Sequence, residues 1–163
     1  MSPDVGRGAA VTRPTTDKVR ESLFNALESR GEIEGRAVLD LFAGSGALGI
    51  EALSRGARHC TFVERDRRAV EALRTNIEQL GLGDRSAVVV ADVMARLPGL
   101  PRTDLALADP PYAFTSWEAL LAGVDAEQVV AESDHPLEPT PRWAVQRVRR
   151  YGRTWVTWFE RVP

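Results

Sequence analysis

Four consecutive residues, Asp109, Pro110, Pro111 and Tyr112, follow an apolar run that is typical of a β-strand. The exocyclic amino group of a nucleobase is a poor nucleophile because its lone pair is delocalised into the ring. A carboxylate oxygen of Asp109 and the carbonyl oxygen of Pro110 could accept hydrogen bonds from both N–H groups and turn that lone pair out of the ring plane. The prolines stiffen the loop, and Tyr112 offers an aromatic face for a base that has left its stack. These residues therefore predict methylation of a nucleobase amino group, with S-adenosylmethionine as methyl donor.

A glycine-rich stretch begins 65 positions earlier, at Gly44-Ser45-Gly46. It follows an apolar strand pattern and precedes a helical one, the arrangement in which a backbone can approach a bound cofactor. Glycine at 44 and 46 removes the Cβ atoms that would hold the ligand off and permits positive φ. The next helix presents its free N–H groups to an anionic group. Alone this pattern is weak evidence, because many glycine turns before helices bind nothing.

Three acidic residues stand at or near the ends of predicted strands: Asp40, Glu64 and Asp92. Asp40 interrupts an apolar strand and is expected to face the cofactor, with a turn or capping carboxylate as the alternative. Glu64 lies 20 positions after Gly44, where doubly wound folds place the acid that binds ribose hydroxyls. Asp66 already supplies a cap for the next helix, which leaves Glu64 free for this role. Asp92 is expected either to reach the adenine amino group or to cap a helix.

Hydrophobic periodicity predicts alternating strands and helices, and near-continuous apolar strands favour a parallel sheet covered on both faces. The predicted strands are 37–42, 59–64, 87–90, 105–108 and 128–131, followed by a terminal hairpin of 144–151 and 154–161. The predicted helices are a leading one with Thr16 as N-cap and Gly31 as stop, then 47–55, 67–80 and 116–124.

Composition excludes several classes of protein. The chain has 163 residues, of which 44% are hydrophobic, enough for one domain with a sizeable core. Its formal net charge is −2, so no global basic field indicates nucleic-acid binding. Cys60 is the only cysteine and is expected in the core, which excludes a disulfide framework. We found no signal peptide and no transmembrane stretch, and we expect a cytoplasmic, monomeric enzyme.

Basic residues gather near the end of the chain, where residues 142–163 hold six arginines and one glutamate. Arg147 and Arg149 share one face of a predicted strand with Tyr151 and could contact RNA, although a solvated sheet edge is equally compatible. The tryptophans in this segment (Trp143, Trp155 and Trp158) are expected to pack in the core and at its edge rather than to stack on bases.

Together these motifs resemble a known family. The stretches 40–46 and 109–112 resemble a class I, S-adenosylmethionine-dependent amino-methyltransferase. The segments 13–25 and 48–57 are similar to the RsmD family, which methylates guanine N2 in 16S ribosomal RNA. The resemblance implies a seven-stranded sheet of order 3-2-1-4-5-7-6 with strand 7 antiparallel. It also implies a substrate within the assembled small ribosomal subunit.

The resemblance assigns site residues in three groups, and we expect no metal. The guanine would be handled by Asp109, Pro110, Pro111 and Tyr112. The expected cofactor-binding residues are Thr16, Asp40, Phe42, Gly44, Ser45, Gly46, Glu64, Arg65 and Asp92. The expected RNA-binding residues are Arg13, Arg147 and Arg149.

The front of the chain departs from the family pattern. RsmD-like chains carry a basic, glycine-containing β-hairpin before the segment that starts at Arg13. Here residues 2–12 contain only Arg7 as a basic residue and no strand pattern. We expect residues 1–12 to form a flexible tail and residues 13–163 a single methyltransferase domain.

Three other functions fit parts of the pattern. Asp-Pro-Pro-Tyr also serves enzymes that methylate adenine or cytosine in DNA or in another RNA, although no DNA target-recognition domain is visible. The glycine loop and Glu64 also fit a nicotinamide-dependent oxidoreductase, but such an enzyme would need a second substrate domain and would leave Asp109 to Tyr112 without a purpose. A non-catalytic binding module would retain cofactor binding without transfer.

Overall fold

The computed structural model describes residues 14–163, and side chains from residue 17 onward. Arg13 and the predicted tail of residues 1–12 lie outside the described residues. The strands are β1 (Ala37–Leu41), β2 (His59–Glu64), β3 (Ser86–Val90), β4 (Thr103–Ala108), β5 (Ala126–Ser133), β6 (Trp143–Tyr151) and β7 (Thr154–Arg161). The α-helices are α2 (Pro14–Ser29), α3 (Ala47–Ser54), α4 (Arg67–Gln79), α5 (Val93–Arg96) and α6 (Trp117–Gly123), with 3₁₀ turns at Gly83–Arg85 and Leu97–Gly99.

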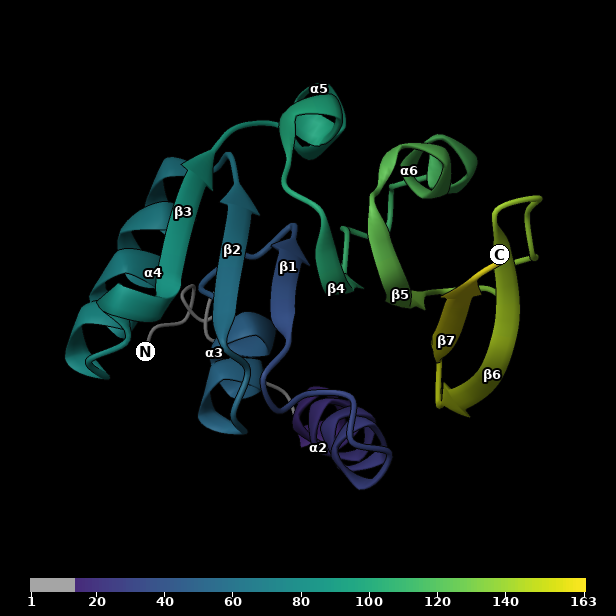
Figure 1. Cartoon of the computed structure of the whole chain (residues 1–163), viewed down its shortest axis with the longest axis horizontal. Coiled ribbons are helices and arrows are strands. Elements are labelled where there is room, and N and C mark those ends of the chain that lie inside the picture. The colour runs from purple at the N-terminus through teal and green to yellow at the C-terminus, as the bar shows by residue number, and fades with distance from the viewer. Residues whose placement is uncertain (1–13) are drawn as a thin grey trace.

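The seven strands form one sheet of order β3-β2-β1-β4-β5-β7-β6 (Figure 1). Strands β1 to β5 pair in parallel, whereas β7 pairs antiparallel with both β5 and β6. The order reverses between β1 and β4, and ligands of open α/β sheets bind at the carboxyl ends of the strands next to such a reversal. The predicted strand order and the antiparallel seventh strand are confirmed.

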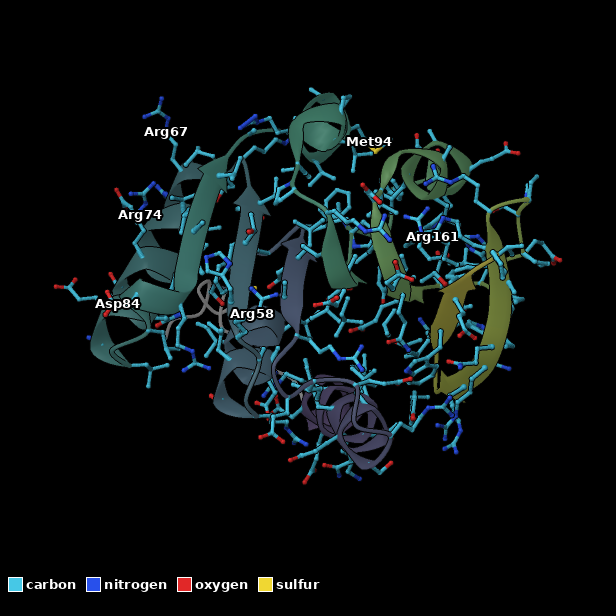
Figure 2. All side chains as sticks on the ribbon, in the orientation of Figure 1. Arg58, Arg67, Arg74, Asp84, Met94 and Arg161 are labelled. Atoms are coloured by element: carbon cyan, nitrogen blue, oxygen red, sulfur yellow. The ribbon has the colours of Figure 1, made fainter. Side chains whose placement is uncertain are left out.

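Helices cover both faces of the sheet, and alternate strand residues reach the two layers. On one face, Val38 and Phe62 pack with residues of α2, α3 and α4, such as Leu23. On the other face, Leu39 packs with residues of α5 and α6, such as Leu120. Figure 1 shows α2 and α3 on one side of the central strands and α5 and α6 on the other. The polar side of α4 faces solvent, and Arg67 and Arg74 point away from the sheet (Figure 2).

The aromatic residues near the end of the chain are largely core residues, as predicted. Trp143 and Trp158 are fully buried, and the indole N–H of Trp143 donates to the Leu121 carbonyl at 2.6 Å. Trp155 is half-buried, with the Arg150 guanidinium over its ring. Because these rings are enclosed or covered, they are not open platforms for bases.

Several predicted boundaries are corrected, and one short helix is added. The leading helix begins at Pro14, so Thr16 lies inside its first turn and is not its N-cap. Proline at a first helical position needs no N–H partner, which explains the earlier start. Strand β5 extends to Ser133 rather than ending at residue 131, because its pairing with β7 continues. The short helix α5 was not predicted, since four residues give too little periodicity.

Candidate active site

A cavity of about 730 Å³ opens at the carboxyl ends of the central strands. Residues at and after the carboxyl ends of β1, β4 and β5 form most of its wall, and α2, the first residues of α3 and α6, and the β6–β7 turn contribute the rest. Residues that the sequence singled out meet there: Phe42, Gly44, Ser45, Asp109, Pro110, Pro111 and Tyr112. The sheet reversal therefore brings together the glycine loop and the Asp-Pro-Pro-Tyr loop, which lie 65 positions apart in the sequence.

The Asp109 to Tyr112 loop is held in place from behind. Pro110 is buried, whereas Tyr112 is 66% exposed and leaves its ring accessible to a ligand. The Phe114 N–H donates to the Pro111 carbonyl at 2.9 Å and closes a tight turn. The Phe114 ring packs edge-on against Phe42 at a centroid distance of 5.2 Å. This contact couples the Asp-Pro-Pro-Tyr loop to the end of β1, and Phe42 itself holds the uncommon φ of 59°.

The two loop glycines have different roles. Gly44 has φ of +61°, and a Cβ there would meet nothing within 4 Å, so its backbone borders open space at the cavity. Gly46, by contrast, precedes α3, and a Cβ there would lie 2.4 Å from Leu73 Cδ1. Gly44 therefore leaves room for a ligand, whereas Gly46 permits close packing of the loop on α4. Gly46 does not line the cavity, so its contact with the cofactor remains a prediction.

Asp40 takes the position expected of its capping alternative, and a contact with the cofactor remains a prediction. Its side chain is 1% exposed, and one carboxylate oxygen accepts from the Gly49 N–H at 2.9 Å. This N–H belongs to the first turn of α3 and has no partner within the helix. Burial, with Asp109 and Glu64 nearby, raises the pKa of Asp40 well above its usual range. Asp40 thus fixes α3 to β1, which is the alternative of a capping carboxylate.

Glu64 braces the glycine loop from the neighbouring strand. Its carboxylate accepts from the Gly44 N–H at 2.8 Å and from the Asp66 N–H at 2.9 Å. Asp66 caps α4 by accepting from the Ala69 N–H, as predicted. Glu64 does not line the cavity, so its binding to ribose hydroxyls stays a prediction; its position beside Gly44 is compatible with that role.

Two further predicted cofactor residues lie at the neighbouring strand ends, outside the cavity wall. Asp92 caps α5 by accepting from the Ala95 N–H at 3.0 Å, so its capping alternative is realised. Its other carboxylate oxygen lies 3.5 Å from the Arg65 guanidinium. The side chain of Thr16, a further predicted member of this set, lies outside the described residues. Contacts of these residues with a cofactor remain predictions.

The predicted RNA-binding arginines of β6 do not line the cavity. Arg147 is half-buried and lies over the Trp158 ring at 5.2 Å, whereas Arg149 is exposed. Tyr151, on the same strand, does line the cavity, and its hydroxyl hydrogen-bonds with Ser22 of α2 at 2.6 Å. This bond ties the terminal hairpin to the leading helix at the cavity wall.

The sequence predicts no role in the site for five charged residues that line the cavity: Asp17, Arg20, Glu132, Asp134 and Arg153. Asp17 and Arg20 belong to the family motif. Glu132 directly follows the predicted strand 128–131, and nothing in the local sequence marks it. Only the pairing of Ala108 with Ala131 shows that Glu132 lies beside Asp109.

The pKa values of the two central carboxyl groups of the cavity, Asp109 and Glu132, are raised. Burial raises the pKa of Asp109 to about 6, because the surrounding loops displace water even though part of its surface is open. Burial also raises the pKa of Glu132 to about 8, helped by the negative charge of Asp109 and opposed by Arg20. Carboxyl groups with raised pKa values in a cavity are typical of functional sites.

Glu132 is therefore expected to make stability depend on pH. Its pKa is raised from 4.5 to about 8, so the folded chain binds more protons than the unfolded chain between these values. The free energy of unfolding should consequently fall as pH rises through this window. Glu132→Gln should remove about 1–3 kcal/mol of that fall between pH 5 and pH 8, less than the full shift because water reaches the group.

Urea denaturation at several pH values measures this effect. Glu127→Gln is the matched control, because Glu127 lies on the same strand but is exposed and pairs with Arg102. The control should keep the pH dependence of the unmodified chain. Equal slopes in the Glu132→Gln variant and the unmodified chain would contradict the prediction.

Three further features of the described residues concern Cys60, membrane-spanning helices and metal-binding groups. Cys60 is fully buried in β2, and burial raises its pKa well above the usual range, so it is a core residue as predicted. In residues 14–163 no helix is both long and apolar enough to cross a membrane. The same part of the chain contains no group of three acidic, histidine or cysteine side chains placed to hold a metal ion.

Comparison with known proteins identifies the family. A family model described as Conserved hypothetical protein 95 matches residues 6–160. The chain belongs to this family. Ribosomal RNA small subunit methyltransferase D of Haemophilus influenzae is 33% identical over 153 residues, which cover 86% of this chain and 78% of that protein. The resemblance to the RsmD family is thereby confirmed.

Two further relatives extend the similarity over most of the chain. YlbH of Bacillus subtilis, named as a candidate rRNA methyltransferase, is 41% identical over 138 residues, 78% of this chain and 74% of that protein. The solved structure of YhhF of Escherichia coli, a candidate methyltransferase, has a TM-score of 0.81 and 34% identity. It covers 91% of this chain, and the match covers 87% of that chain. The class I methyltransferase fold is thus confirmed for this member of the family.

Proposed function

We propose that this chain transfers a methyl group from S-adenosylmethionine to the exocyclic N2 amino group of a guanine in 16S ribosomal RNA. The observation that supports it most strongly is one cavity lined by Asp109, the Asp-Pro-Pro-Tyr prolines, Tyr112 and the glycine loop. Family membership and the name of the Haemophilus relative support a ribosomal RNA substrate. A ribosomal substrate also places the activity in the cytoplasm.

The residues present fit S-adenosylmethionine. Gly44 leaves open space where a side chain would fill the cavity, and Glu64 lies at the neighbouring strand end beside it. When bound, S-adenosylmethionine would supply an electrophilic methyl carbon to the amino nitrogen; its S–C bond would break as the N–C bond forms, S-adenosylhomocysteine would leave, and the methylated nitrogen would release one proton to water. This chemistry needs alignment of the amino nitrogen with the methyl group more than acid catalysis, and it requires no metal-binding residues.

The protein's own groups would position the base. Asp109 and the Pro110 carbonyl accept hydrogen bonds from the two N2–H groups, and the exposed Tyr112 ring stacks on the flipped guanine. Stacking on an aromatic ring contributes about 1–3 kcal/mol per base. Arg20 and Arg153, together with Arg149 on the adjacent edge strand, provide cations for RNA phosphates near the cavity.

Glu64 should be important for cofactor affinity rather than for the chemical step. Glu64→Ala removes the acceptor for the Gly44 N–H and the proposed acceptor for the ribose hydroxyls. We expect binding of S-adenosylmethionine to weaken by about 1–3 kcal/mol, the contribution of a hydrogen bond to a charged group. Isothermal titration calorimetry measures the change. Affinity within twofold of the unmodified chain would remove Glu64 from the binding site.

Labelled S-adenosylmethionine tests the proposed function. The acceptors are small ribosomal subunits that lack the modification, naked 16S RNA and DNA, and the methylated nucleoside is identified after digestion. N2-methylguanosine from subunits or 16S RNA is the expected product. Methylated adenine or cytosine would indicate another amino-methyltransferase, and tight cofactor binding without transfer to any acceptor would contradict the ribosomal assignment.

A further inference from the structure

Glu132 lies near the end of β5 in the cavity, and the proposed transfer assigns it no role. It follows Ala131 in β5, and Ala131 pairs with Ala108, the last residue of β4. Asp109 and Glu132 are therefore at the same level of neighbouring strands, which lie about 4.8 Å apart. Both line the cavity together with Tyr112. A base that stacks on Tyr112 and presents its amino group to Asp109 would consequently have Glu132 beside the next group on its edge.

The Glu132 carboxyl group is half-buried. Within residues 17–163 no hydrogen bond or ion pair reaches it, and the Arg20 guanidinium pairs with Asp17 at 3.2 Å. Asp109 and Asp40 add negative charge nearby, and together with burial they raise the pKa of Glu132 to about 8. Near neutral pH the empty site therefore holds Glu132 largely as the neutral acid, and a ligand that donates a hydrogen bond to it favours the ionised form.

The nucleobases differ in the group next to their amino group. In guanine the N2 amino group adjoins N1–H, a second donor. In adenine and cytosine the ring nitrogen next to the amino group is unprotonated and accepts. A carboxylate beside the amino-binding residues therefore stabilises guanine and leaves an adenine or cytosine ring nitrogen facing a second acceptor.

We propose that Glu132 is the specificity residue of this site, and that its carboxylate accepts the guanine N1–H while Asp109 and the Pro110 carbonyl accept the N2 hydrogens. This inference rests on the proposed guanine-N2 transfer. Three contiguous donors on one edge of the base then meet three acceptors at the ends of β4 and β5. Asp-Pro-Pro-Tyr alone serves all amino-bearing bases, so the neighbouring strand supplies the discrimination.

The test compares two nucleotides that share the 2-amino group. Guanosine monophosphate has N1–H, whereas 2-aminopurine riboside monophosphate has an unprotonated N1. Binding of each to the protein saturated with S-adenosylhomocysteine is measured by NMR titration above pH 8, where the free Glu132 is ionised and has no donor for the N1 of 2-aminopurine. The unmodified chain should bind the guanine nucleotide at least about 10-fold more tightly, the effect of one hydrogen bond to a charged group.

Two variants of the same residue separate specificity from folding. Glu132→Gln offers an N–H donor to the N1 of 2-aminopurine, so its preference for guanine should fall at least about 10-fold. Glu132→Asp keeps the carboxylate and should retain the preference at lower affinity for both nucleotides. Glu127→Gln, at the other end of β5, should leave both affinities unchanged.

The outcomes distinguish a failure of the role of Glu132 from a failure of the proposed transfer. The role of Glu132 is overturned if Glu132→Gln prefers the guanine nucleotide as strongly as the unmodified chain does. It is also overturned if Glu132→Asp loses this preference to the same extent as Glu132→Gln. Neither result touches the proposed transfer, which depends on the nucleoside made from ribosomal acceptors. Conversely, methylated adenine from those acceptors would overturn both the proposed function and the proposed recognition of guanine by Glu132.

Discussion

Asp109→Ala should lower methyl transfer at least about 100-fold while changing the dissociation constant for S-adenosylmethionine by no more than about threefold. The expectation follows from the position of the carboxylate at the end of β4, opposite the glycine loop in the same cavity. In the proposed transfer this carboxylate accepts a hydrogen bond from the amino group, and without it the lone pair would stay in the ring plane. Single-turnover transfer to small ribosomal subunits and calorimetric titration of the cofactor measure the two quantities.

A matched aspartate serves as control for this prediction. Asp84 is exposed in the 3₁₀ turn before β3, at the far edge of the sheet from the cavity (Figure 2). Asp84→Ala should leave both transfer and cofactor affinity unchanged. If Asp109→Ala weakened cofactor binding as much as Glu64→Ala did, the division of roles between the two acids would be wrong. Equal transfer by Asp109→Ala and the unmodified chain would remove Asp109 from the chemistry.

The sheet could be predicted from the sequence because its strands are short, apolar and separated by helices with clear stop signals. His59–Glu64 and Thr154–Arg161 agree with the predicted strands residue for residue. The strand order could not come from periodicity, because hydrophobic pattern describes a strand's burial and not its neighbours. It came from the resemblance to a family, and the structure confirms it.

The candidate site could be predicted only where its residues form a local motif. Asp109 to Tyr112 and Gly44 to Ser45 are contiguous in the sequence and line the cavity as expected. Glu132 is absent from every local motif, since its importance arises from the pairing of β5 with β4. Arg153 likewise reaches the cavity only because the β6–β7 turn lies beside α2.

Asp40 shows why a residue type in a motif does not decide its role. An acid inside an apolar strand must find a partner, and both a cofactor and a helix N-terminus can provide one. The structure supplies the Gly49 N–H at 2.9 Å, so the buried carboxylate is satisfied within the protein. The same reasoning applies to Gly46, whose missing side chain makes room for Leu73.

The second large effect is expected at Gly49, where the helix and the sheet approach most closely. A Cβ on Gly49 would lie 2.3 Å from Phe62 Cε1, 2.7 Å from Cys60 Sγ and 2.9 Å from Asp40 Oδ2. Real contacts of a Cβ atom are longer than any of these, so at least one neighbour must move. Phe62 and Cys60 are fully buried in β2, and side chains in a close-packed interior move only at a cost.

Gly49→Ala should therefore destabilise the fold by about 2–3 kcal/mol, in the range for overpacking a core. The added methyl group pushes α3 from the sheet and lengthens the bond between the Gly49 N–H and Asp40. Urea denaturation at constant pH measures the loss. Gly83→Ala is the control, because a Cβ there meets nothing within 4 Å and its φ is ordinary; its stability should change by less than about 0.5 kcal/mol.

The same variant distinguishes packing from ligand contact at the glycine loop. If Gly49 only permits close approach of α3 to β1 and β2, Gly49→Ala should lower stability, while the folded fraction keeps its cofactor affinity within about threefold, since the loop itself is unchanged. Gly44→Ala should instead weaken cofactor binding more than it lowers stability. Its Cβ would enter open space at the cavity, and its φ of +61° adds strain only locally. Stability of Gly49→Ala equal to that of the control would mean that α3 can shift freely, and Asp40 would then not be the residue that fixes this helix.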